Sequence, residues 1–271
     1  EADIDTVLKR EEEKVWEVIR DVAPDMKVFD VLSYPKLYHN LKAAVKEVCT
    51  EKETPGIFYD DCDIPGREML RIIENREFSR LPGNMGRVAE EALDTMLHTR
   101  DGQLCDVMID KAALEAVYEA GKRSGEPIIE NYADAMVAIA DIKIAVRSRK
   151  TGKSGDFMRS AMAECRSVNA EQLIRAALSG EEEIARYLEG TSYAGGADAL
   201  RESPSAFERW CDNRMTEMLK TQKYEAFSVG SLLGYLIARE NEIKTVRIIL
   251  TGKQNGFSDD AVRERRREMY V

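Results

Sequence analysis

Two short stretches of the chain carry residue types that could bind a phosphate group or a metal ion. The first, Thr151-Gly152-Lys153-Ser154-Gly155, looks like the end of a phosphate-binding loop. Such a loop also needs a strand and a glycine five residues before Gly152, so that backbone N–H groups surround the anion. Arg147 stands there, inside a helical pattern. A helix that ends at a glycine explains the stretch, with a lysine near its last carbonyls, so we predict no nucleotide or other cofactor site.

The second stretch is Asp60-Asp61-Cys62-Asp63, between two prolines. Carboxylates of this kind hold Mg²⁺ in all-helical diphosphate enzymes, but only where a second acidic cluster faces the first. No such second cluster is evident, so we interpret the stretch as an exposed acidic turn and predict no metal site. An all-helical, metal-dependent enzyme that uses Asp60, Asp61 and Asp63 stays open as a further hypothesis. The only histidines, His39 and His98, have no nucleophile at a recognisable spacing, so we predict no catalytic residues.

Composition indicates a large, charged, helical protein. The 271 residues are 44% apolar and 33% charged, and the net charge of −10 argues against a nucleic-acid partner. Five scattered cysteines without a C-x-x-C pair favour reduced thiols. No apolar run approaches the roughly 20 residues that cross a bilayer. Because the sequence begins Glu1-Ala2, we expect residues to be missing at the front.

Apolar spacing near 3.6 residues recurs along the chain, and no alternating strand pattern does. We therefore predict an all-α fold. Asn169 is predicted to cap one of its helices, and the stretch from Gly190 to Gly196 is predicted to be a loop. The predicted helices cover residues 4–22, 28–49 (interrupted or restarted at Pro35), 66–80, 88–98, 104–121, 126–149, 171–178, 181–188, 205–220, 229–250 and 258–271.

One block occurs three times: an acidic or amide residue, Leu or Ile, Lys, a short apolar run, then a turn and Phe. Its lysines, Lys42, Lys143 and Lys244, are 101 residues apart. A second block, at residues 5–8, 94–97 and 216–219, precedes each lysine. A period this long predicts three related helical subdomains rather than a solenoid. We place them at residues 1–63, truncated at its N-terminus, 64–157 and 158–271.

These repeat ends supply the candidate partner-binding residues. The three lysines could contact a partner around a threefold axis, or each could lay its stem along its own helix, which is the interpretation we favour. Arg239 and the arginine-rich tail, including Arg263 and Arg266, are further candidates for contacts. Glutamates alternate with these tail arginines, which is typical of a helix end rather than of a nucleic-acid site.

Residues Val229 to Arg247, with the turn from Gly252 to Phe257, resemble the closing motif of the C subunit of V-type (archaeal-type) ATP synthases. That family includes the d subunit of vacuolar ATPases. The blocks Asn40-Leu41-Lys42 and Asp141-Ile142-Lys143 are similar to the earlier repeats of the family. Outside these blocks and the last forty or so residues, the resemblance is one of architecture.

The resemblance implies a funnel of three helical subdomains around a pseudo-threefold axis. It implies a non-catalytic central-stalk protein on the cytoplasmic side of the membrane, without a transmembrane segment of its own. One mouth of the funnel would receive the D and F subunits of the shaft, and the other face would rest on the proteolipid rotor ring and pass on torque. The alternative is an all-helical scaffold or adaptor protein of another pathway.

Overall fold

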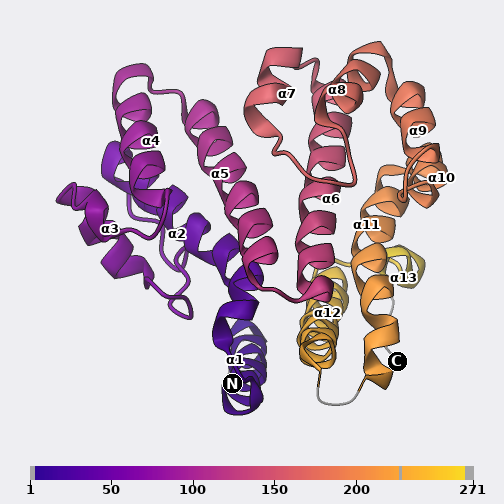
Figure 1. The fold of residues 1–271 in the computed structure, drawn as a ribbon, viewed down its shortest axis with the longest axis horizontal. Helices are drawn as coiled ribbons and strands as arrows, with labels where there is room; N and C mark the ends of the chain where they lie inside the picture. The colour runs from indigo at the N-terminus through magenta and orange to yellow at the C-terminus, as the bar shows by residue number, and fades with distance from the viewer. Residues whose placement is uncertain (1–3, 226–227, 266–271) are drawn as a thin grey trace.

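The computed structural model describes residues 4–225 and 228–265, and within these ranges the chain forms helices and no strands (Figure 1). The predicted all-α fold is thereby confirmed. The α-helices are α1 (Ile4–Val22), α2 (Asp30–Thr50), α3 (Gly66–Glu74), α4 (Met85–Thr99), α5 (Gly102–Arg123), α6 (Pro127–Thr151), α7 (Gly155–Ala161), α8 (Ala170–Ser179), α9 (Glu181–Glu189), α10 (Gly195–Glu202), α11 (Pro204–Leu219), α12 (Val229–Gln254) and α13 (Asp259–Arg265). Short 3₁₀ helices cover Met26–Phe29 (η1), Phe78–Arg80 (η2) and Lys220–Tyr224 (η3).

Local sequence signals fix many of the helix ends. Asn169 caps α8 as predicted, because its side-chain oxygen accepts a hydrogen bond from the N–H of Gln172 at 2.9 Å. Asp101 caps α5 in the same way, through the N–H groups of Gln103 and Leu104. Pro127 occupies the first turn of α6, where its missing N–H costs nothing. These signals lie within a few residues of each boundary, which is why the sequence predicts those boundaries well.

The structure departs from the predicted elements at four places. The predicted helix over residues 66–80 ends at Glu74, and Arg76, with a φ of 54°, separates it from η2. The predicted loop from Gly190 to Gly196 is wrong at its end, because α10 begins at Gly195. The sequence did not predict the short helix α7 either. The helix α2 runs through Pro35 without an interruption. Residues 266–271 of the predicted tail helix lie outside the described part of the chain.

Three apolar clusters form the core. An outer cluster joins α2 to α3, α4 and α5, and a second joins α6 to the segment from α7 to α11. A third cluster, here called the hub, gathers α1, η1, the start of α2, the end of α5, the start of α6, the end of α11 and the start of α12. The buried hub residues are Val15, Ile19, Val28, Phe29, Val31, Leu32, Val117, Ala120, Ile129, Tyr132, Ala133, Leu219, Leu233, Leu236 and Ile237.

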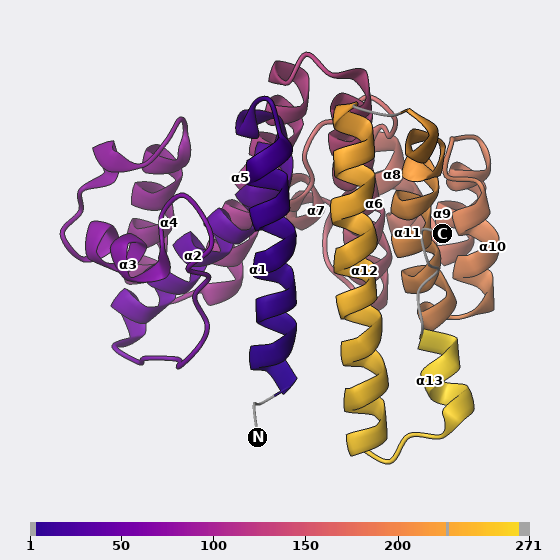
Figure 2. The ribbon, with the colours of Figure 1, turned by 90° about the horizontal axis from the view of Figure 1, so that it is seen from below.

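Helix pairs run out from this hub. The helices α5 and α6 form a hairpin, and α2 packs along α5 (Figure 1). On another side α1 and α12 lie next to each other and run in opposite directions (Figure 2). The predicted subdomains 1–63 and 64–157 both contribute residues to the first outer cluster, so these two subdomains share one core. The division into three repeats and the funnel around a pseudo-threefold axis stay predictions.

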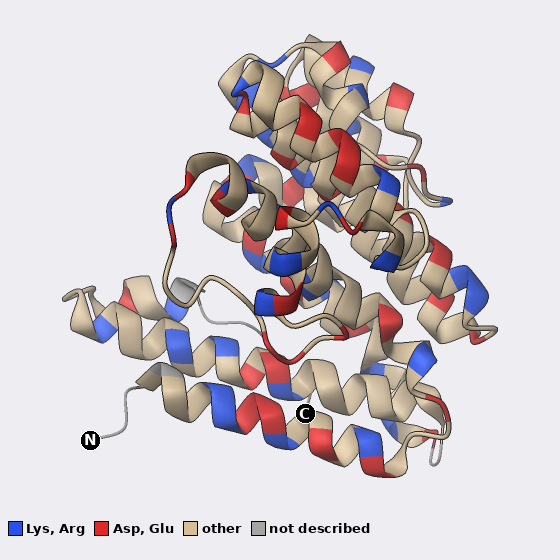
Figure 3. Ribbon diagram, turned by 90° about the vertical axis from the view of Figure 1, so that its left-hand side faces the viewer, with Lys and Arg blue, Asp and Glu red and all other residues tan. Residues whose placement is uncertain are grey.

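No described helix combines the length and the apolar character that spanning a membrane requires. Acidic and basic residues are interspersed along the helices in the view of Figure 3.

Candidate interaction surface

The repeat lysines of the first two copies bridge neighbouring helices. Lys42 of α2 lies 2.6 Å from Asp110 of α5, and Lys143 of α6 lies 2.7 Å from Glu208 of α11. One helical turn further on, Lys46 pairs with Asp106 at 2.7 Å and Arg147 with Glu208 at 3.1 Å. Partly exposed pairs of this kind contribute about 0–1 kcal/mol each, so they orient the helices more than they stabilise them.

In the third copy the lysine pairs with a helix that precedes it in the chain, whereas Lys42 and Lys143 pair with helices that follow. Lys244 of α12 binds Asp212 on the preceding helix α11. Arg239, also on α12, binds Glu242 on its own helix and reaches Glu11 of α1 at 3.3 Å. Arg263 lies 3.6 Å from Asp260 within α13, and its side chain is 74% exposed. Arg266 lies outside the described residues. Partner binding therefore stays a prediction for all six candidate residues, which are Lys42, Lys143, Lys244, Arg239, Arg263 and Arg266.

Buried polar residues at the same repeat position fasten loops to α2 and α6. Asn40 is fully buried and accepts a hydrogen bond from the N–H of Tyr59 at 2.8 Å. Its amide group also donates to the carbonyl oxygens of Tyr59 and Ile64, at 2.7 and 3.2 Å. Asp141, 101 residues later, accepts from the N–H of Ala163 at 3.2 Å. The sequence did not predict that Asn40 and Asp141 fasten loops. The available signal was that each copy of the block begins with a polar residue, followed by Leu or Ile and then Lys.

The carboxyl group of Asp141 is poorly satisfied. Its Oδ2 atom is buried and has no hydrogen-bond partner among the described residues. Burial raises its pKa to about 7, despite the hydrogen bond from Ala163. With this raised pKa, the carboxyl group is partly protonated near neutral pH.

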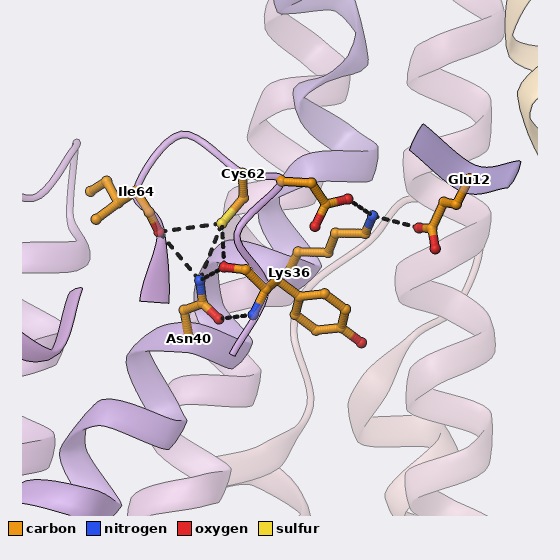
Figure 4. Close-up of polar contacts among 7 residues, drawn as sticks. Glu12, Lys36, Asn40, Cys62 and Ile64 are labelled. Carbon is orange, nitrogen blue, oxygen red and sulfur yellow. Dashed lines mark hydrogen bonds and ion pairs between the residues drawn. The ribbon is translucent and has the colours of Figure 1, made fainter. Parts of the chain in front are cut away.

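The acidic stretch around Asp61 belongs to a junction of α1, α2 and the following loop (Figure 4). The Lys36 ammonium lies 2.6 Å from Glu12 and 2.7 Å from Asp61. It also lies over the rings of Trp16 and Tyr59, 5.9 and 5.6 Å from their centres. The described part of the chain holds no group of three His, Cys, Asp or Glu residues arranged to bind a metal ion. The contacts of Asp61 are thus those of a structural joint.

The phosphate-loop lookalike is a helix end, as the sequence predicts. Gly152 adopts a left-handed conformation with φ of 65° after the last residue of α6. Lys153 donates to the side-chain oxygen of Gln103 at 2.6 Å, and Ser154 caps α7. His39 and His98 each lie within hydrogen-bond distance of a backbone carbonyl oxygen, those of Ile57 and Asp94. These groups are therefore engaged in holding local structure.

The described part of the chain is thus all-helical, with lysines that bridge helices, buried polar residues that fasten loops and a shared apolar hub. The chain belongs to the family described as "ATP synthase (C/AC39) subunit", which it matches over residues 1–265. The family prediction made from the repeat blocks and the closing motif is confirmed.

Similar proteins come from bacteria and archaea. The chain is 21% identical to the C subunit of the V-type sodium ATPase of Enterococcus hirae, across 99% of this chain and 83% of that protein. It is 22% identical to the C subunit of the A-type ATP synthase of Methanocaldococcus jannaschii, across 92% of this chain and 68% of that protein. The corresponding protein of Methanobrevibacter smithii is 24% identical, across 92% of this chain and 71% of that protein.

Proposed function

We propose that this chain is a non-catalytic central-stalk component of a V-type or A-type ATP synthase. In this role it connects the D/F shaft to the proteolipid ring on the cytoplasmic side of the membrane and transmits torque during ion transport. The observation that carries the proposal is the family match over residues 1–265. The relatives named above are the C subunits of such complexes.

The helix pairs give this role a physical basis. A torque-transmitting part must keep its shape under load, and its contacts need shape complementarity and polar pairing rather than a reaction site. The hub joins distant segments of the chain, and the Lys42 and Lys143 bridges keep neighbouring helices in register. We propose that the remaining exposed part of these lysines and of Lys244, together with Arg239, Arg263 and Arg266, contacts the neighbouring proteins of the complex.

Co-purification with the D/F pair of the same complex tests the proposal. We expect the full chain to co-elute with D/F in gel filtration. The Arg263→Glu variant should bind more weakly than an Arg10→Glu control, which reverses an exposed charge on α1 instead. A folded chain that associates neither with D/F nor with the proteolipid ring would contradict the central-stalk role. Equal binding by the two variants would remove Arg263 from the contact surface.

A further inference from the structure

A groove of about 610 Å³ follows the exposed side of α5. Its walls are the start of α2 with Tyr34 and Tyr38, the turn from Pro82 to Met85, and Glu164 in the segment after α7. This volume lies within the range of protein sites that enclose a ligand or a partner's side chains. The residues already described as helix bridges or loop fasteners do not line it.

Each of the three cations that line the groove already makes a polar contact within the chain. Lys111 donates to the carbonyl oxygen of Arg159 at 3.0 Å. Lys122 pairs with Glu119 at 3.0 Å and lies 5.3 Å from the ring centre of Tyr118. The guanidinium group of Arg123 donates to the hydroxyl of Tyr34 at 3.5 Å. An incoming anion would have to displace these contacts.

The other polar side chains that line the groove can accept hydrogen bonds. Glu115 and Glu164 are exposed, and neither makes a hydrogen bond or ion pair within the described ranges. Tyr38 is only 5% exposed, but its hydroxyl group makes no hydrogen bond among the same residues and is accessible from the groove that Tyr38 lines. Burial raises the pKa of Tyr38 to about 12, so the hydroxyl group stays neutral. A donor bound in the groove could hydrogen-bond to this hydroxyl group in place of solvent.

We infer that the groove along α5 binds an arginine side chain of a partner protein, held between Glu115, Glu164 and the hydroxyl group of Tyr38. A guanidinium group brings five donors and a flat face, so it pairs with carboxylates and stacks on tyrosine rings at once. The ammonium group of lysine offers a point charge without the flat face. This inference rests on the proposed function in one respect, which is that the partner is a neighbouring protein of the rotary complex.

Photo-crosslinking in the assembled complex tests the inference directly. A Tyr118→p-benzoylphenylalanine chain places the reactive group in the groove wall. We expect an adduct with a partner peptide that contains arginine. The control is the same substitution at Tyr224, which is 80% exposed on η3, away from the groove; it should not label that peptide. No adduct, or an adduct with a peptide that lacks basic residues, would overturn the inference. The identity of the labelled partner separately tests the proposed function.

A second experiment measures what the two carboxylates contribute to binding. This chain is removed from the complex, and the dissociation constant is measured as variants of the chain rebind. The double variant Glu115→Gln, Glu164→Gln should raise the dissociation constant at least about tenfold at low salt, with a smaller effect at high salt. The double control Glu17→Gln, Glu90→Gln removes the same charge from exposed glutamates without ion pairs and should stay within about twofold of the original chain. Equal rebinding by both double variants, with unchanged melting temperatures, would overturn the inference.

Discussion

Asn40 and Asp141 occupy the same repeat position but differ in one atom, and this difference predicts opposite mutational effects. The folded pKa of Asp141, about 7, lies above its ordinary value of 3.8. The contribution of this group to stability is therefore fully present below about pH 4 and is lost as the pH rises through 7. We expect Asp141→Asn to raise the free energy of unfolding more at pH 8 than at pH 5, by about 1–3 kcal/mol. Urea unfolding at both pH values measures this, and an equal effect at both would contradict it.

The reverse exchange at Asn40 should destabilise the protein. In Asn40→Asp a carboxylate oxygen replaces the amide group that donates to Tyr59 and Ile64, so it would face two carbonyl oxygens. We expect a loss of about 2–4 kcal/mol in urea unfolding at pH 7. The exposed Asn131→Asp variant on α6 is the matched control, since its side-chain oxygen already accepts from Arg166 and should change stability by less than about 0.5 kcal/mol. Similar losses in the two variants would show that buried carbonyl contacts are not the cause.

The repeat block could be found from the sequence because its lysines recur at a fixed spacing. What Asn40 and Asp141 do could not be found, since their partners at Tyr59 and Ala163 lie about twenty residues away in segments without periodic pattern. The acidic run at Asp61 shows the same limit. Composition identified it as polar, but only the fold brings Lys36 to it.

At the scale of elements, the missed helix α10 has a clear cause. A pair of glycines normally predicts a loop, but Gly195 and Gly196 stand where the indole of Trp210 packs against the backbone. We expect Gly196→Ala to lower the free energy of unfolding by about 1–3 kcal/mol, since the new Cβ would lie 2.7 Å from the Trp210 ring. Gly190→Ala is the control, because its Cβ would make only an ordinary contact at 3.6 Å. Thermal unfolding of both variants measures the difference, and equal melting temperatures would contradict the packing argument.

The joint between α1 and α2 predicts a second effect at this scale. Lys36→Met leaves Glu12 and Asp61 half-buried without their cation. We expect a loss of about 1–3 kcal/mol and faster hydrogen exchange in α1 and the loop around Tyr59. Lys14→Met is the control, since Lys14 pairs with Glu11 within α1 and is 66% exposed. Unchanged exchange in α1 after Lys36→Met would show that the apolar contacts of α1 alone hold it.

At the scale of the whole molecule, the all-α class followed from composition and periodicity, whereas the hub did not. Its members range from Val15 to Ile237, and no local pattern separates them from the apolar residues of the outer clusters. Leu233 and Leu236, for example, lie on the same apolar stripe that any amphipathic helix shows. Their shared position with Phe29 and Ile129 is a product of chain topology. Periodicity along each helix carries no information about that topology.

The hub predicts how the molecule loses its structure. Leu236 and Ile184 are both fully buried, but Leu236 belongs to the hub and Ile184 to the second outer cluster. Truncation of either residue to alanine should cost about 2–5 kcal/mol. We expect Leu236→Ala to speed hydrogen exchange at the start of α2, the end of α5 and the start of α6, because all three pack on the hub. Ile184→Ala should speed exchange mainly from α7 to α10. If Leu236→Ala affected only α12 and α1, the helix pairs would be independent units, and the proposed torque-transmitting role would lose the rigid centre it requires.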